Sequence, residues 1–379
     1  MAESKEIELK RGLRDVYLDR TEASFIDGSL GRLQYRGYNI DDLAKQSNFE
    51  EVMYLLLYGT LPKIAELDEF NALLVKSRPV PTEILGIIDV VKTLEPMDVL
   101  RTAISALAAF DSEVGDNSAE AVLRKGVRIA AQAPTIVAAH HRIRNGMEPI
   151  PPNGNLNHAG NFLYMLRGTE PPPDEATILD VDFILHAEHG SNASAFAARV
   201  TASTQSDLYS AIVTGIATLK GPWHGGAAER VMEVAEEIGH PDNAAAYASK
   251  VLGSGGRIMG FGHRVYKAED PRAQHLKERA RDLGEKYGDP KWFQILSALG
   301  DAMEPYRRRG VFANVDYYAG VIYRLMSIPE DLYVPIFALG RIAGWVLQVQ
   351  EQYANNILIR PLTLYTGPMD LDYCPIAQR

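Results

Sequence analysis

Residues 176–203 read ATILDVDFILHAEHGSNASAFAARVTAS, and this stretch predicts two helices in close succession. The first pattern is the apolar run from Ala176 to Ala187, which ends in His186-Ala-Glu-His189-Gly. The second, Ser191 to Ser203, begins almost at once. A pair of histidines is therefore expected at a helix end.

Helical patterns continue on both sides of this stretch. An apolar helix is expected from Asp207 to Leu219; it breaks at Gly221-Pro-Trp-His224-Gly-Gly and resumes from Ala227 to Ile238. Upstream, Ser118 to Arg144 has helical periodicity with Pro134 inside, which predicts a kinked helix or a pair of helices. The break places residue 224 at a helix junction.

Only the beginning of the chain predicts β structure. Phe25-Ile-Asp-Gly and the segment from Gly31 to Tyr38 suggest a small hairpin around Asp27-Gly28. After it, Asn39 or Asp41 can cap a helix from Ile40 to Lys45, and Asn48 can cap another that stops at Gly59. The predicted fold class is mainly α, with one small N-terminal β-hairpin.

The 379 residues favour two domains. Segments become shorter and more charged after residue 225, so we expect a small helical domain over 226–331. Residues 1–225 form the expected large helical domain, to which 332–379 returns. The apolar stretch Leu332 to Val349 contains Arg341 and Gln348, which favours a buried core helix over a membrane span. The weakly patterned tail from Pro361 is expected to pack on a partner subunit.

Composition excludes several classes of function. The formal net charge is -10 and no long Lys/Arg block occurs, which argues against nonspecific binding to nucleic acid or to a membrane surface. Cys374 is the only cysteine, so neither an intrachain disulfide nor a cysteine metal site is expected. The polar start, MAESKEIELKRGLRD, lacks the apolar stretch of a signal peptide, and we expect a cytoplasmic protein.

Two histidines lie in glycine-rich surroundings that suit catalysis. His224 is flanked by glycines and precedes a helix whose N-terminus favours developing negative charge, although it could simply cap the helix turn. His263 lies in Arg257-Ile-Met-Gly-Phe-Gly-His-Arg-Val-Tyr-Lys267, where glycines allow close approach of a ligand and cations suit phosphates. This loop lacks the dinucleotide G-x-G-x-x-G spacing, and an ordinary connector is the alternative.

Four charged residues complete the candidates. Asp316 lies among apolar and aromatic neighbours that would raise the pKa of its carboxyl group, or it could be a helix N-cap. Arg341 interrupts an apolar helix and needs an anion, either a ligand carboxylate or an internal salt bridge. Arg272, at a helix start, and Arg360, before Pro361, could each be surface cations.

A metal site is not expected. His186 and His189 are three residues apart and could face one way on a helix, but no third and fourth ligands occur near them in the sequence.

Taken together, these segments resemble the citrate synthases from end to end. The resemblance is carried by seven motifs in order: Phe25-Ile-Asp-Gly with Tyr35-Arg-Gly-Tyr, His186-Ala-Glu-His-Gly, Gly221-Pro-Trp-His-Gly-Gly, Gly260-Phe-Gly-His-Arg-Val-Tyr, Asp270-Pro-Arg, Asn314-Val-Asp and Arg360-Pro. It implies a helical fold whose small domain closes over the substrates, in the short dimeric bacterial and archaeal form.

The resemblance also implies a mechanism. Asp316 would remove a methyl proton from acetyl-CoA while His224 hydrogen-bonds the thioester oxygen. His263 would polarise and protonate the oxaloacetate carbonyl as the new carbon–carbon bond forms. Citryl-CoA would then be hydrolysed, with no metal or redox cofactor. Oxaloacetate would be bound by His189, Arg272, Arg341 and, from the other subunit of a homodimer, Arg360.

The resemblance likewise implies a CoA site. The loop of Ile258, Met259, Gly260, Phe261 and Gly262 would surround the adenine, with Arg257, Lys267 and Lys250 near the phosphates.

Three other functions remain open at this level. A 2-methylcitrate synthase would use the same residues with propionyl-CoA, and one methylene changes binding by only about 1–3 kcal/mol, so an enzyme active on both donors is also possible. A catalytically silent CoA- or carboxylate-binding protein is opposed by intact His224, His263 and Asp316. A pyridine-nucleotide dehydrogenase is opposed by the missing fingerprint.

Overall fold

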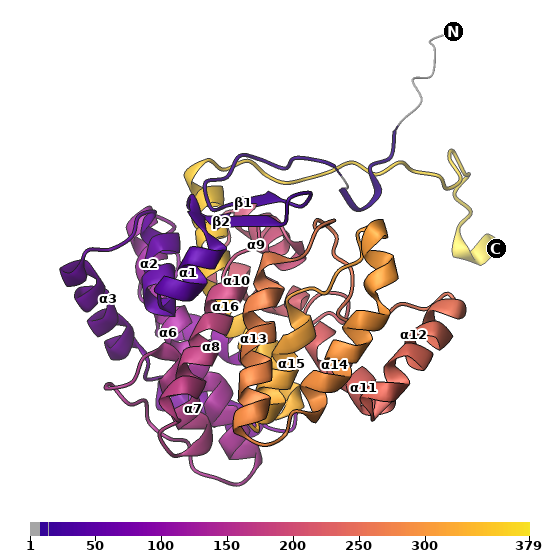
Figure 1. The fold of residues 1–379 in the computed structure, drawn as a ribbon. Helices are drawn as coiled ribbons and strands as arrows, with labels where there is room; N and C mark the ends of the chain where they lie inside the picture. The colour runs from indigo at the N-terminus through magenta and orange to yellow at the C-terminus, as the bar shows by residue number, and fades with distance from the viewer. Residues whose placement is uncertain (1–7, 14) are drawn as a thin grey trace.

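A computed structural model describes residues 8–13 and 15–379, and the fold is almost entirely helical (Figure 1). Residues 1–7 and 14, part of the polar N-terminal stretch, lie outside the described residues. The α-helices are α1 Ile40–Gln46, α2 Phe49–Tyr58, α3 Ile64–Ser77, α4 Thr82–Val90, α5 Pro96–Leu107, α6 Ala119–Arg144, α7 His158–Arg167, α8 Pro173–His186, α9 Ala193–Ser203, α10 Leu208–Leu219, α11 Ala227–Ile238, α12 Ala244–Gly253, α13 Pro271–Lys286, α14 Lys291–Ala302, α15 Asp316–Leu325 and α16 Tyr333–Ala354.

Six short 3₁₀ helices are also described: η1 Arg11–Leu13, η2 Ala108–Phe110, η3 Pro241–Asn243, η4 Glu304–Arg309, η5 Glu330–Leu332 and η6 Ile376–Gln378.

The β structure is a small antiparallel sheet near the N-terminus. Strands β1 (Ser24–Asp27) and β2 (Arg32–Tyr35) pair with Ser24 opposite Tyr35, and β3 (Tyr38–Asn39) adds to β2. The predicted hairpin is confirmed, whereas the two-residue strand β3 is too short to leave a pattern in the sequence.

Side-chain caps explain why several helices begin where the sequence predicts. Asn39 and Asn48 accept backbone amides at the starts of α1 and α2, and Asp207 does the same for α10. α2 ends at Gly59, which has a left-handed backbone (φ 90°). The segment around Pro134 is one continuous helix, α6, and not a pair of helices.

The core is organised around α16, which packs against α6, α8, α9 and α10. This helix is long and apolar enough to cross a membrane, but its apolar window is wholly buried inside the protein. The prediction of a buried core helix is therefore confirmed.

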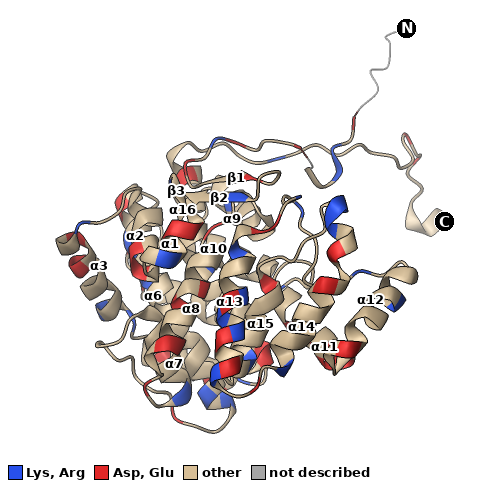
Figure 2. Ribbon diagram, in the orientation of Figure 1, with Lys and Arg blue, Asp and Glu red and all other residues tan. Residues whose placement is uncertain are grey.

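Helices α11 to α15 pack mainly on one another: α13 and α11 contact α15, and α12 contacts α14. Charged residues of both signs are interspersed over the helices, as the alternation along α13 shows (Figure 2). Beyond α16 the chain continues as an extended segment to the short 3₁₀ helix η6 (Figure 1). Most of its apolar side chains are exposed, among them Leu362 at 85% and Tyr373 at 82%.

Candidate active site

Two histidine rings from distant segments lie together. His189 follows the end of α8, and His263 lies in the loop between α12 and α13; their ring centroids are 5.2 Å apart. The Nε2 atom of His189 is 3.1 Å from the hydroxyl of Tyr266. Burial, assisted by the charge of Arg272, lowers the pKa of His189 well below its ordinary value and that of His263 to about 4. Both rings are therefore neutral at pH 7.

The tautomer of His263 follows from its hydrogen bonds. Its Nδ1 atom accepts the backbone amides of Val265 at 3.0 Å and Tyr266 at 3.1 Å. Since Nδ1 is an acceptor, the neutral ring carries its proton on Nε2. That nitrogen is available to donate a hydrogen bond to a substrate oxygen.

Arg272 lies at the start of α13 and is held by its own helix cap. The Asp270 carboxylate accepts from Nε at 2.9 Å and from Nη2 at 2.8 Å, and both side chains are buried. Burial disfavours the charged form of both side chains, but their mutual attraction and hydrogen bonds outweigh this effect. The pKa of Arg272 is therefore raised and that of Asp270 is lowered. The bidentate contact fixes the guanidinium plane.

Arg341 is 1% exposed on α16, and its Nε donates to the backbone carbonyl of His186 at 2.5 Å. Among the residues that the structure describes, no carboxylate lies within ion-pair distance of its guanidinium. Burial lowers the pKa of Arg341 to about 10, although the nearby Glu188 opposes this. The internal salt bridge considered from the sequence is thus not formed among the described residues, and Glu188 acts on this charge only from beyond ion-pair distance.

His224 lies in the turn between α10 and α11 and is oriented by Ser194. The Ser194 hydroxyl is 2.8 Å from Nε2, and the Ser194 backbone amide donates to the same atom at 3.3 Å. An accepting Nε2 places the proton of the neutral ring on Nδ1. Burial, and then the charge of Arg341, lowers the pKa of His224 to about 4. A neutral imidazole here is suited to hydrogen-bond an oxyanion.

Asp316 is the first residue of α15, and its backbone amide donates to the Asn314 side chain at 3.1 Å. The N-cap considered from the sequence is therefore wrong, because Val315 holds the cap position and Asn314 supplies the side-chain contact. Burial raises the pKa of the Asp316 carboxyl group, against the opposing influence of His186 and Arg272. A raised pKa makes the carboxylate a stronger base.

Electrostatic influences show that these groups share one region. Arg272 and Arg341 both lower the pKa of His189, Arg341 lowers that of His224, and Asp316 and Arg272 influence Arg341. The structure therefore brings together six of the seven residues predicted for catalysis and oxaloacetate binding. The seventh, Arg360, is exposed on the C-terminal segment, and no polar contact is described for it.

The predicted CoA loop is hydrogen-bonded to residues 312–314, the segment that precedes Asp316. Gly260 and Gly262 have positive φ angles of 77° and 86°, and the Gly262 amide donates to the Phe312 carbonyl at 2.8 Å. Asn314 donates its backbone amide to the Gly260 carbonyl at 2.9 Å and its side chain to that of Gly262 at 3.3 Å. Gly260 is also required by packing, because a Cβ there would lie 2.5 Å from the Tyr317 ring. Several backbone groups of the loop are thus already paired.

The remaining loop residues and the predicted phosphate-binding cations differ in exposure. Ile258 is buried and Met259 partly buried, and the Phe261 ring packs 4.7 Å from that of Tyr317. The exposed cations are Arg257, Lys250, which makes a long 3.9 Å contact with Glu237, and Lys267, whose Nζ is 3.5 Å from the His263 carbonyl.

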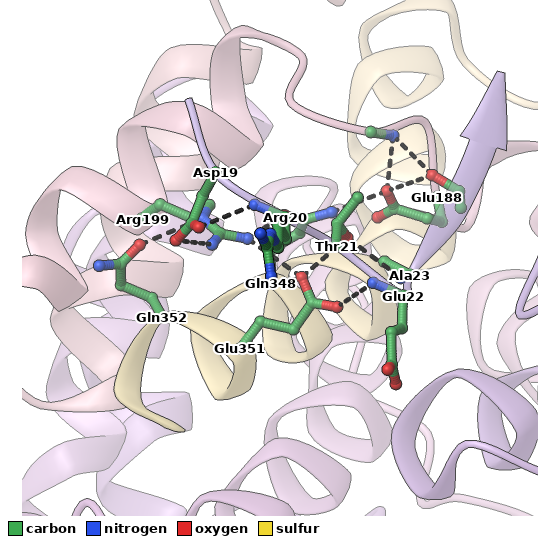
Figure 3. Close-up of polar contacts among 12 residues, drawn as sticks. Asp19, Arg20, Thr21, Glu22, Ala23, Glu188, Arg199, Gln348, Glu351 and Gln352 are labelled. Carbon is green, nitrogen blue, oxygen red and sulfur yellow. Dashed lines mark hydrogen bonds and ion pairs between the residues drawn. The ribbon is translucent and has the colours of Figure 1, made fainter. Parts of the chain in front are cut away.

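Glu188, between the two histidines of the His186–Gly190 segment, is a buried carboxyl group that sequence reasoning missed. Its Oε1 atom accepts from Gly190 N at 2.6 Å, Ser24 Oγ at 3.1 Å and Gln348 Nε2 at 2.9 Å. Burial raises its pKa to about 7, against the influence of Arg341. Figure 3 shows Glu188 at one end of a group of polar contacts that continues to Arg199.

Ser194, Tyr266 and Asp270 were also missed as supporting residues. Asp270 carried a signal, because an acid two residues before an arginine at a helix start can pair with it. Ser194 and Tyr266 carried none, since their contacts join segments 30 and 77 residues apart. No group of three or more potential metal ligands occurs among residues 8–13 and 15–379.

Comparison with known proteins identifies close relatives. The family model for the C-terminal domain of citrate synthase matches residues 12–362. The chain is 44% identical to the citrate synthase of Haloferax volcanii over 98% of this chain and 99% of that one, and 39% identical to 2-methylcitrate synthase 1 of Corynebacterium glutamicum over 98% and 99%. The citrate synthase of Thermoplasma acidophilum, solved with carboxymethyl-CoA and oxaloacetate, superimposes with a TM-score of 0.92 at 32% identity, covering 98% of this chain and 100% of that one.

Proposed function

Because this chain belongs to the citrate synthase family, we propose that it condenses acetyl-CoA with oxaloacetate and water to give citrate and CoA. The observation that carries the proposal is that Asp316, His224 and His263 share the influence of two buried arginines. Arg272 influences the pKa values of His263 and Asp316, and Arg341 influences that of His224 and is itself influenced by Asp316. We assign no metal or redox cofactor to the reaction, and acetyl-CoA is a substrate.

Asp316 is the proposed base and His224 its electrophilic partner. A thioester α-proton is far less acidic than a carboxylic acid, so the enolate needs a hydrogen bond as it forms. The pKa of Asp316 is raised by burial, which narrows that gap. Nδ1–H of His224 is the donor to the thioester oxygen, because Nε2 is occupied by Ser194.

His263 activates the second substrate. Its Nε2–H donates to the oxaloacetate carbonyl oxygen, and the enol carbon attacks the polarised carbonyl carbon. The alkoxide takes the Nε2 proton of His263 as citryl-CoA forms, and the proton that Asp316 removed from the methyl group returns to this imidazole through solvent. Water then attacks the thioester carbonyl carbon and the C–S bond breaks; one proton of the water goes to the CoA sulfur and the other leaves the new carboxyl group of citrate. The two backbone amides on Nδ1 keep the Nε2 proton aimed at the substrate.

Oxaloacetate is bound by His189, Arg272 and Arg341, whose guanidinium groups match its carboxylates. Arg360 of a second copy completes the site in the homodimer that we propose. The exposed apolar side chains of residues 361–379 support this assembly, because a monomer rarely leaves so many apolar groups in water.

Acetyl-CoA is bound by the loop Ile258–Gly262, with Arg257, Lys267 and Lys250 toward the phosphates. Residues 226–331 form the small domain that closes over the substrates, and 1–225 with 332–379 the large one. Closure excludes water and so protects acetyl-CoA from hydrolysis before condensation. We place the enzyme in the cytoplasm, with neither nucleic acid nor membrane as a partner.

The second candidate is 2-methylcitrate synthesis from propionyl-CoA, and the 39% identity to an enzyme of that name favours it over a dehydrogenase or a silent binding protein. Purified protein is mixed with oxaloacetate and either acyl-CoA, and free thiol release is followed to compare kcat/KM. A higher kcat/KM for acetyl-CoA is expected. A higher value for propionyl-CoA would leave the mechanism intact but change the substrate, and absence of oxaloacetate-dependent thiol release would reject both functions.

A further inference from the structure

The β1–β2 hairpin contacts both segments that carry the neighbouring histidines. At the start of β1, Ser24 Oγ accepts a hydrogen bond from the Gly190 amide at 3.1 Å and donates one to Glu188 Oε1 at 3.1 Å. The hydroxyl of Tyr35, on β2, accepts the Glu188 amide at 3.3 Å. Glu188 and Gly190 flank His189, so this strand pair holds that histidine from both sides.

The turn of the same hairpin holds the second segment. The carbonyl of Gly28 accepts the backbone amides of Lys267 at 2.7 Å and Ala268 at 3.2 Å. A Cβ on Gly28 would lie 2.3 Å from the Val265 carbonyl oxygen, and one on Gly31 would lie 2.5 Å from that of Glu269. The turn therefore packs closely against residues 265–269, which follow His263.

The residues that contact the hairpin also hold or directly neighbour the two histidines. Val265, whose carbonyl meets Gly28, also donates the amide that holds His263 Nδ1. On the other side, His189 is one residue from each group that Ser24 contacts. Ser24 and Gly28 lie at the two ends of the same stretch of hairpin, whose strands are paired from Ser24 to Asp27, so the hairpin links the two segments and constrains the spacing between them.

We propose that the β1–β2 hairpin is a positioning element of the oxaloacetate site, in which Ser24 places the His189 segment and Gly28 places the His263 segment. This inference rests on the proposed function. These contacts reach neither the loop of residues 258–262 nor α15. Their one link to the proposed CoA site is the backbone amide of Lys267, whose side chain is exposed and is not held by the hairpin. The main influence of the hairpin therefore falls on oxaloacetate.

Gly28→Ala is the sharpest test. Gly28 does not have a left-handed backbone, so alanine is opposed by the close approach of Val265, whose carbonyl oxygen would lie 2.3 Å and whose Cγ1 atom 3.1 Å from the new Cβ. Hairpin and loop must separate by about 1 Å, and a displacement of that size costs roughly 100-fold in reactivity. We expect kcat/KM for oxaloacetate to fall about 100-fold, with the KM for acetyl-CoA changed less than about twofold.

The control is Gly86→Ala on α4, where an added Cβ meets nothing within 4 Å. It adds the same methyl group and is expected to keep wild-type kinetics. Thermal unfolding of all variants separates positioning from loss of folded protein. If the lost activity of Gly28→Ala equals its loss of folded protein, the inference is overturned.

Ser24 provides a second test that adds no bulk. Ser24→Ala removes both hydrogen bonds of the Ser24 hydroxyl, to the Gly190 amide and to Glu188 Oε1. A fall of roughly fivefold to tenfold in kcat/KM for oxaloacetate is expected, with recovery in Ser24→Thr. Wild-type oxaloacetate kinetics in both Gly28→Ala and Ser24→Ala would overturn this inference alone. A wild-type protein that releases no thiol with oxaloacetate would overturn the proposed function as well.

Discussion

Replacing Ser194 with alanine tests how His224 is held. Ser194 is fully buried, and its hydroxyl lies 2.8 Å from His224 Nε2 and accepts the Trp345 indole N–H at 3.0 Å. The same hydroxyl donates to Asn192 Oδ1 at 2.8 Å. The alanine variant leaves the His224 ring with only the 3.3 Å backbone contact and leaves a buried indole N–H without its acceptor. Both catalysis and stability should respond.

The magnitudes follow from these two losses. A net hydrogen bond contributes about 1–1.5 kcal/mol, so misorientation of His224 should lower kcat roughly fivefold to tenfold. The unpaired indole should lower the free energy of unfolding by about 1–3 kcal/mol. The KM for oxaloacetate should stay unchanged, because Ser194 contacts none of the arginines.

The assay is steady-state thiol release at saturating oxaloacetate, with denaturant unfolding in parallel. Thr201→Val is the matched control: Thr201 is on the same helix, and its hydroxyl bonds Thr214 and the Ala197 carbonyl, away from His224. It should keep wild-type kcat. An unchanged kcat in Ser194→Ala, or a loss confined to the KM for oxaloacetate, would refute the assigned role of Ser194.

Three further predictions concern the base, the arginine support and acid stability. Asp316→Asn should lower kcat by about 10²–10⁴-fold while oxaloacetate still binds, as titration calorimetry can check; a near-normal kcat would reject the assigned base. Asp270→Asn leaves Arg272 buried without its counter-charge and should lower the free energy of unfolding by about 3–5 kcal/mol, measured by urea denaturation; an unchanged value would mean that the pair contributes little. Burial lowers the pKa of His158 from 6.5 to about 3, so between these pH values the unfolded chain binds a proton that the folded chain does not bind. The contribution of neutral His158 to the free energy of unfolding is therefore present above pH 6.5 and is lost as the pH falls toward 3. Between pH 6.5 and 5 this loss is about 2 kcal/mol, and it should be absent in His158→Phe; an identical pH slope in both proteins would contradict it.

The helices were predictable because their signals are local. The end of α2 at Gly59 and the start of α10 after Asp207 follow from residues within one turn of the helix terminus. The continuity of α6 through Pro134 was harder to predict from the sequence. Whether a helix continues through a proline depends on the packing around it, and Pro134 is buried within α6.

The residues that support the site were harder to predict because their contacts are nonlocal. His224, His263 and Arg341 could be selected from glycine-rich or apolar surroundings in the sequence. The contact between Ser194 and His224 depends on how α9 meets the α10–α11 turn, which no local pattern records. The neutral state of His224 and His263 likewise follows from their burial in the folded chain, which lowers the pKa of each ring.

The roles of Arg360 and of the two domains stay predictions. Arg360 needs a second copy of the chain to meet its site, and closure needs both substrates. Neither is a property of one free chain.

Condensation can be tested by following the carbon atoms themselves. Acetyl-CoA labelled with ¹³C in its methyl group is mixed with oxaloacetate and the protein, and the products are observed by NMR. If Asp316 and the two histidines join the substrates as proposed, the label appears in a methylene carbon of citrate, in step with release of CoA. Label that stays in acetyl-CoA, or that appears only in free acetate, would contradict condensation.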